Sequence, residues 1–260
     1  MLHELLAARY LDVLKDLDIS YLDRQHPDAK SKPVPRDGKP GLSGLFLPSV
    51  PGHIGRAKHR IMVVGSETAQ WNVLTKDEAF PSLPAYIEKA MSKHQKFFNE
   101  RLLDGNSRGA TFHNFMRSVA GRCGSEGLIY SNLFCFDWNR GSPMRSKDYF
   151  PTVEKYSELL IKAQIEVLKP ELIIFANGVT SVRSRRKFFP ISGEHAACTK
   201  GHDYEHVEEA RFPNQVIRKH HLWGFTLYDE IRCFRIHHPS AQSKEAAQAR
   251  KFLLTLLPTK

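Results

Sequence analysis

Short apolar segments that alternate with long amphipathic ones constrain this fold more than any other feature. Apolar runs of strand length lie at residues 61–64, 128–136 and 171–178. Helical periodicity occupies the intervals, at residues 83–103, about 110–120 and 152–169. Such alternation is typical of a parallel sheet covered by helices on both faces. We therefore predict an α/β fold, a three-layer sandwich with a central, mainly parallel sheet flanked by helices.

The two ends of the chain complete this plan. The first eighteen residues carry apolar side chains at helical spacing among scattered acids, which predicts an amphipathic helix and not a signal peptide. Residues 24–44 are rich in Pro, Lys and Gly and predict an extended connection. We expect residues 1–44 to form an N-terminal helix and extended connection, and residues 45–260 to form the α/β domain. The last predicted elements are a strand or hairpin arm within 223–240 and a helix at 243–257.

The charge balance is basic. The chain carries 38 Lys and Arg against 28 Asp and Glu, a formal net charge of +10. Such an excess favours a polyanionic partner, most simply nucleic acid, although a solvated basic surface has the same composition. Basic residues cluster at 181–189 and 216–221, which favours binding. No apolar run approaches the roughly 18 residues of a membrane span, so we expect a cytoplasmic monomer without a membrane partner.

Cysteine and histidine spacing gives little sign of a metal. The chain has four cysteines without a Cys-x-x-Cys pair: Cys123, Cys135, Cys198 and Cys233. The segment "EHAACTKGHDYEH" gathers four candidate ligands: His195, Cys198, His202 and His206. This spacing matches no standard zinc pattern, and a polar surface loop explains the same residues. We expect neither a metal nor another cofactor.

Polar, turn-prone residues follow three predicted strands. The first strand runs into Ser66 and Glu67, the second contains Asn132 in its tail, and the last ends at His-Pro-Ser, residues 238–240. In open α/β sheets, ligands bind beyond the carboxyl ends of the strands. We therefore expect an acid, an amide and an imidazole to meet at one pocket.

These segments resemble the motifs of the uracil-DNA glycosylase superfamily. Four segments are similar to its motifs and follow the same order: "VVGSETAQW", "YSNLFCFDWNRGSP", "LKPELIIFANG" and "HHPSAQS". Together they cover about residues 45–250 and are fairly specific as a set. The second segment also resembles the iron–sulphur branch. That branch requires an amino-terminal cysteine pair, however, and this chain has no cysteine before Cys123.

The resemblance implies roles for three residues. Hydrolysis of the bond between base and deoxyribose resembles glycoside hydrolysis, in which positive charge develops on the sugar. Glu67 would orient the water and stabilise that charge, and His238 would donate a hydrogen bond to the departing base. Asn132 would read the Watson–Crick edge of the flipped pyrimidine. The ordinary alternatives are a solvated or capping glutamate, a structural histidine beside proline, and a turn asparagine.

The remaining candidates would hold the base and the DNA backbone. Trp71 and Phe112 are the candidates for stacking on a flipped base, although both would also suit the core. Phosphate contacts position DNA without reading its sequence. The predicted base-binding residues are Ser66, Ala69, Gln70, Trp71, Phe112 and Asn132. The predicted DNA-binding residues are Ser49, Arg183, Arg185, Arg186, Lys187, Ser240 and Gln242.

The resemblance implies the reaction better than the substrate. Ala69 stands where one branch places a tyrosine that blocks substituents at the 5-position of the base. The segment "VVGSETAQWN" also resembles a divergent bacterial group that attacks bulky modified cytosines of phage DNA as antiviral defence. We expect base excision that leaves an abasic site, with glucosylated hydroxymethylcytosine as the preferred substrate. The alternatives are uracil removal in base excision repair, a non-catalytic binder of damaged or modified DNA, and a metal-dependent nuclease.

Overall fold

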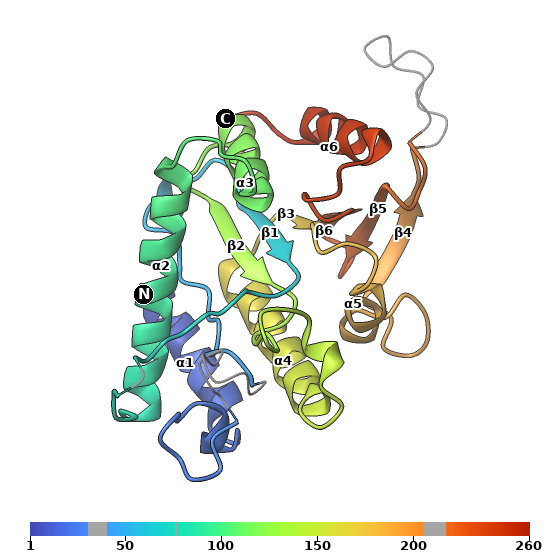
Figure 1. Cartoon of the computed structure of the whole chain (residues 1–260). Coiled ribbons are helices and arrows are strands. Elements are labelled where there is room, and N and C mark those ends of the chain that lie inside the picture. The colour runs from blue at the N-terminus through green and yellow to red at the C-terminus, as the bar shows by residue number, and fades with distance from the viewer. Residues whose placement is uncertain (31–40, 76, 205–216) are drawn as a thin grey trace. The chain divides into compact units, whose positions relative to one another are not determined.

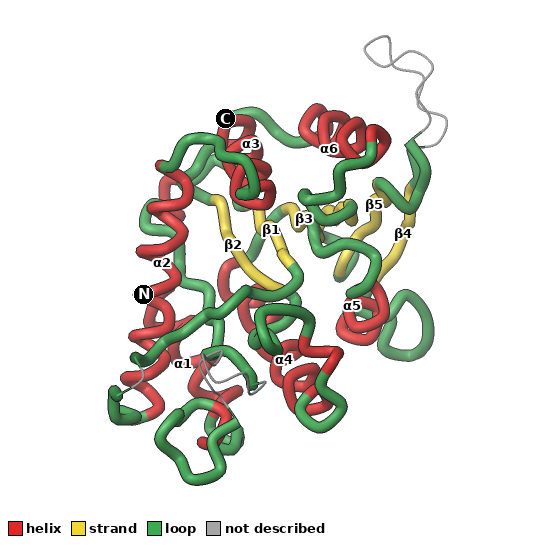
Figure 2. The backbone as a smooth tube through the Cα atoms, in the orientation of Figure 1, coloured by secondary structure: helices red, strands yellow, loops and turns green. Residues whose placement is uncertain are grey.

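A computed structural model describes residues 1–30, 41–75, 77–204 and 217–260 (Figure 1). Within these residues, six strands form one sheet in the order β2-β1-β3-β6-β5-β4. Their bounds are β1 (Ile61–Gly65), β2 (Leu128–Asn132), β3 (Leu172–Phe175), β4 (Cys198–His202), β5 (Leu222–Leu227) and β6 (Ile231–Ile236). The helices, red in Figure 2, are α1 (Leu2–Leu14), α2 (Leu83–Leu103), α3 (Thr111–Cys123), α4 (Phe150–Leu168), α5 (Val182–Phe188) and α6 (Lys244–Leu256).

The sheet is mixed. Strands β1, β3 and β6 are parallel neighbours, with Val63 opposite Ile174 and Ile174 opposite Phe234. Strands β5 and β4 extend the sheet in antiparallel pairing. The predicted α/β class with a mainly parallel sheet flanked by helices is confirmed, with a hairpin extension. Because β1, β3 and β6 are parallel, their carboxyl ends lie at the same edge of the sheet.

The described chain divides into two compact units. The first unit comprises Met1–Val50, Ser66–Glu100 and Ser131–Lys169, and the second comprises Pro51–Gly65, Arg101–Tyr130 and Pro170–Lys260. The boundary that we expected at residue 44 is not among those that separate the units. None of the described helices combines the length and apolar character needed to cross a membrane.

In the first unit, α1 packs against α4. The stripe Leu6, Tyr10 and Leu14 is buried, as the i, i+4, i+8 spacing predicts. Arg9 of α1 forms an ion pair with Glu166 of α4 at 2.6 Å. The expected extended connection also ends in the core, because residues 41–49 are all buried. The rest of that connection, residues 31–40, lies outside the described residues.

In the second unit, helices cover both faces of the sheet. Phe225 pairs with Cys233 and Gly224 with Phe234, so Phe225 and Phe234 point to opposite faces. The guanidinium of Arg185, on α5, lies 5.0 Å from the centre of the Phe225 ring. On the other face, Phe252 of α6 meets the ring of Tyr204, which in turn meets Phe234. Figure 1 shows α5 and α6 on the two sides of the strands β3 to β6.

Candidate active site

The candidate acid Glu67 lies in the loop that follows β1, in the first unit. Its carboxylate accepts a hydrogen bond from the hydroxyl of Ser66. Burial raises the pKa of Glu67, and the nearby Asp137 carboxylate adds to the rise, whereas Ser66 and Arg145 oppose it. A carboxylate with a raised pKa is a better proton acceptor, which suits a group that orients and deprotonates water.

Asp137 holds this loop in place. It is fully buried, and its Oδ2 accepts hydrogen bonds from Thr68 Oγ1 at 3.0 Å and from the Gln70 N–H at 2.9 Å. Its Oδ1 accepts from the Arg140 N–H at 3.0 Å. Main-chain N–H groups donate to both of its oxygens, which favours the ionised carboxylate because that form has the larger acceptor capacity. Burial raises the pKa of Asp137, and these hydrogen bonds counteract the rise. Because Gln70 has a φ of 68°, the loop needs this external support.

Asn132, the last residue of β2, belongs to the same unit as Glu67. Its exposed fraction is only 6%. Two residues later, the Phe134 N–H donates to the carbonyl of Ser66 at 2.9 Å. This bond ties the segment that follows β2 to the loop that carries Glu67. The structure therefore brings two of the three predicted catalytic and base-reading residues into one part of the first unit.

The candidate base-contacting histidine, His238, follows β6 in the second unit. Its Nδ1 accepts a hydrogen bond from the Ser240 N–H at 3.2 Å and lies 2.6 Å from the Ser240 hydroxyl oxygen. Since a main-chain N–H can only donate, Nδ1 carries no proton and the Ser240 hydroxyl donates to it as well. Burial lowers the pKa of His238, and the charge of Arg250 lowers it further. His238 is thus a neutral imidazole with its proton on Nε2.

An aromatic group lies beside His238 in the second unit. The ring of Phe112 stacks on His238, with centroids 6.0 Å apart and planes 20° apart. Phe112 also contacts Tyr130 of β2 at 5.4 Å, and His113 packs edge-on against the same tyrosine. Burial lowers the pKa of His113 to about 4, with help from the charges of Arg101 and Arg117.

Asn177, two residues after β3, is a candidate that the sequence reasoning missed. It is 2% exposed, and within the described part of the chain neither its Oδ1 nor its Nδ2 has a hydrogen-bond partner. A Cβ on the next residue, Gly178, would lie 3.6 Å from His238. Buried amides without partners are rare because they lose hydrogen bonds to water and gain none within the protein. In the sequence, the Asn-Gly pair at residues 177–178 indicates only the end of a strand.

Two predicted contact residues are structural. Trp71 is 7% exposed, its indole N–H donates to the Leu45 carbonyl at 3.1 Å, and its ring packs edge-on against Phe46. Ser49 is 6% exposed, and its N–H and hydroxyl both lie 3.0 Å from His94 Nδ1. Both side chains therefore serve the core of the first unit.

The other predicted DNA contacts lie at the surface, with one exception. Ala69, Ser240 and Gln242 are exposed, as are Arg183, Arg186 and Lys187 of α5. Arg185 differs, because it is only 4% exposed and points toward the sheet. The basic cluster thus contains three exposed side chains, those of Arg183, Arg186 and Lys187, and one buried arginine, Arg185.

The metal alternative receives no support from the described residues. His195 and His202 are exposed and Cys198 is buried, whereas His206 lies outside the described residues. No group of three or more His, Cys, Asp or Glu side chains suited to a metal occurs in the described part of the chain. All four cysteines are buried and free.

Glu67 and Asn132 belong to the first unit, and His238, Phe112 and Asn177 belong to the second. The expected meeting of all three predicted side chains at one pocket stays a prediction. No protein-family model matches the chain, and no curated protein matches it.

Proposed function

We propose that the protein is a monofunctional DNA glycosylase, which flips a modified pyrimidine out of double-stranded DNA and hydrolyses its N-glycosidic bond to leave an abasic site. The observation that carries this proposal is the state of His238. The Ser240 N–H fixes Nδ1 as an acceptor, and burial keeps the ring neutral. The only proton on the ring is then on Nε2, where it can be donated to a substrate.

A neutral donor suits the departing base. As the glycosidic bond breaks, negative charge develops on the pyrimidine and is shared by its carbonyl oxygen. A fixed donor aimed at such an oxygen accelerates reactions by roughly 10²- to 10³-fold. The stacked ring of Phe112 holds the imidazole plane, so little reorganisation is needed when the charge appears.

Glu67 supplies the complementary function at the sugar. A carboxylate near the anomeric carbon stabilises the developing cation and positions the attacking water. The raised pKa of Glu67 favours transfer of the water's proton to its carboxylate. The Ser66 hydroxyl, which donates to that carboxylate, orients it.

The proposed substrate is a bulky 5-modified cytosine, such as glucosylated hydroxymethylcytosine of phage DNA, and the proposed role is antiviral defence. Asn132 reads the Watson–Crick edge of the base, and Phe112 is the stacking candidate because Trp71 is committed to the core. The small, exposed Ala69 supports a pocket that is open at the 5-position. The net charge of +10 supports a DNA partner, which exposed Ser240, Gln242 and Arg183 would contact at phosphates.

The test is excision from four duplexes that differ in a single base: glucosylated hydroxymethylcytosine, hydroxymethylcytosine, cytosine and uracil. We expect alkali-labile sites in the glucosylated duplex, formed at the same rate in a chelator. Abasic sites in the uracil duplex alone would replace the substrate but keep the reaction. Direct strand breaks that a chelator abolishes would indicate a nuclease instead.

Two glutamate variants separate catalysis from binding. Glu67→Gln keeps the size of the side chain but removes its charge, and we expect abasic-site formation to fall by at least 100-fold while DNA binding persists. Glu100→Gln is the control, because Glu100 is exposed in the same unit. Tight binding of the modified duplex by a wild-type protein that forms no abasic sites would refute the enzyme and leave the binding module.

A further inference from the structure

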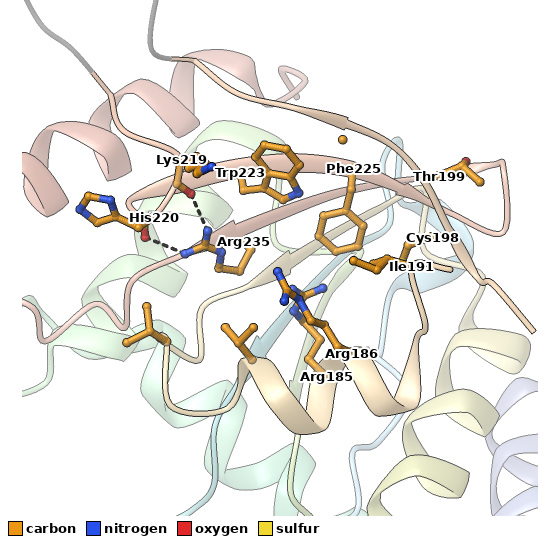
Figure 3. A pocket seen from close by; sticks show the side chains of 13 residues that line it. Arg185, Arg186, Ile191, Cys198, Thr199, Lys219, His220, Trp223, Phe225 and Arg235 are labelled. Carbon is orange, nitrogen blue, oxygen red and sulfur yellow. Dashed lines mark hydrogen bonds between the residues drawn. The ribbon is translucent and has the colours of Figure 1, made fainter. Parts of the chain in front are cut away.

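The second unit contains a cavity of about 820 Å³ that the proposed catalytic residues do not line (Figure 3). It lies between α5 and the face of the sheet that carries Phe225. Ligand pockets for small molecules typically measure roughly 300–1,000 Å³. The cavity therefore has the size of a binding site for an entire small ligand.

The charge of this cavity is one-sided. Arg185, Arg186, Lys219 and Arg235 line it, and no Asp or Glu is among its lining residues in the described part of the chain. Arg185 is 4% exposed, and its Nε lacks a hydrogen-bond partner among the described residues. Burying a cation without a counter-charge is costly, and a bound anion would offset that cost.

Aromatic rings hold Arg185 in place, and none of the ion pairs among the described residues involves it. Its guanidinium lies 5.6 Å from the centre of the Phe175 ring and 5.0 Å from that of Phe225, which is cation–π geometry. Burial lowers the pKa of Arg185, and burial with the charges of Arg185 and Arg186 lowers that of Arg235 to about 10. Both guanidinium groups nevertheless stay charged at neutral pH.

Arg235 shapes the rim of the cavity. Its guanidinium donates to the carbonyl of His220 at 2.6 Å and also to that of Lys219. Figure 3 shows these two bonds, with the side chains of Arg185 and Arg186 rising from α5 toward the sheet. The turn that carries Lys219 and His220 is thereby tied to β6.

An aromatic and apolar surface adjoins the cations. Trp223 and Phe225 of β5 both line the cavity. A Cβ on Gly201 would lie 2.1 Å from the Trp223 ring, so only glycine at this position lets the indole rest against β4. Val179 and Ile191 also line the cavity, with exposed fractions of 49% and 55%.

We propose that this cavity binds a nucleotide, with its phosphates on Arg185 and Arg186 and its base against Trp223. Arginine binds phosphate oxygens in a bidentate manner, and an indole offers a flat face for stacking. The nucleotide can be free or can be the phosphorylated end of a DNA strand, since both present the same groups. This inference is independent of the glycosylase proposal, because it uses neither Glu67 nor His238.

The test is calorimetric titration of the full-length protein with deoxyadenosine triphosphate, inorganic triphosphate and a 5′-phosphorylated tetranucleotide. Arg186→Glu and Arg183→Glu form a matched pair, because both arginines are exposed on α5 but only Arg186 lines the cavity. We expect at least one of the two nucleotide probes to bind wild type and Arg183→Glu equally and to bind Arg186→Glu at least tenfold more weakly. Trp223→Leu should weaken nucleotide binding at least threefold but leave inorganic triphosphate unaffected.

The titrations distinguish a free nucleotide from a DNA end and a specific site from a basic surface. The stronger of the two nucleotide probes identifies the source of the nucleotide. Equal losses in Arg186→Glu and Arg183→Glu would show diffuse attraction by a basic surface and overturn the proposal. The proposal also fails if neither nucleotide probe binds, or if inorganic triphosphate binds as tightly as the nucleotide and Trp223→Leu changes neither.

Discussion

Replacing Asp137 by asparagine tests whether this buried carboxylate holds the loop that carries Glu67. In the wild type, the Asp137 carboxylate accepts hydrogen bonds at 2.9–3.0 Å from Thr68 and Gln70 at one oxygen and from Arg140 at the other, and a hydrogen bond with the Ser43 side chain also lowers its pKa. Asparagine keeps only one oxygen, so its amide nitrogen must face at least one of the three donors. The least harmful orientation points Oδ1 at Thr68 and Gln70 and sacrifices the bond from Arg140.

The expected loss of stability follows from this count. A hydrogen bond to a charged group contributes roughly 1.5–3 kcal/mol, and one such bond is lost in the best orientation. The two remaining bonds become weaker because their acceptor is now neutral. Burial of the charged carboxylate is unfavourable, as the raised pKa of Asp137 shows, so removing that charge offsets part of the loss in stability. We expect the free energy of unfolding to fall by about 2 kcal/mol.

Urea denaturation followed by circular dichroism measures this change. Asp148→Asn provides the control, because Asp148 is exposed, and its effect should stay within about 0.5 kcal/mol. Asp137→Asn should also slow base excision, since the loop no longer holds Glu67 in one position. A variant as stable as the wild type would refute the reasoning, because it would mean that the three hydrogen bonds are not formed by an ionised carboxylate.

Three further predictions concern titration and buried polarity. The excision rate should fall on acidification, because Glu67 becomes protonated. Since burial raises the pKa of Glu67, the midpoint of this fall in a pH–rate profile should lie above that of an ordinary glutamate. The pKa of His113 is lowered to about 4 in the folded protein, so the neutral histidine contributes its full stability only above the unfolded pKa of about 6.5. Acidification from that pH toward pH 4 should therefore lower the free energy of unfolding by about 1–2 kcal/mol, after a discount for solvent screening. Thermal melts of His113→Gln should show a smaller loss over this range. Asn177→Leu should raise the melting temperature, because it removes a buried amide that has no partner among the described residues, and should lower the excision rate if Asn177 contacts the base.

Periodicity alone located most of the parallel part of the fold. The helix expected at 83–103 is α2 with the same bounds, and the apolar runs became β1, β2 and β3. These elements could be predicted because each buries a face whose spacing is visible in the sequence. The β5–β6 hairpin was harder, because its turn uses Tyr228 and Asp229 with positive φ instead of the usual Asn-Gly. Strand β4 has no regular alternation of apolar and polar residues.

The site residues were predictable only where their position along the chain decides their role. Glu67 and His238 follow strands directly, so the pattern identified both as candidates. Asp137 depends on contacts between distant segments, and nothing in its own neighbourhood distinguishes it from an ordinary loop residue. Asn177 follows β3 at the same offset as Glu67 follows β1, but its burial without a partner among the described residues is visible only in the structure. Arg185 is buried together with Ser184, Phe188 and the N-cap residue Ser181, at i, i+3, i+4 and i+7 from Ser181. Three of these four residues are polar, so their spacing forms no apolar stripe in the sequence.

The mixed pairing of the sheet separates two parts of the second unit that can change independently. Strands β1, β3 and β6 are held in register by parallel pairing, and a shift of one strand by a single residue would turn its side chains to the opposite face of the sheet. The β4–β5 hairpin is attached along one side of β6 only, and it forms a wall of the arginine-lined cavity. Lengthening or shortening that hairpin would resize the cavity without altering the register from β1 to β6, so the proposed nucleotide site can diversify while the proposed catalytic edge is retained.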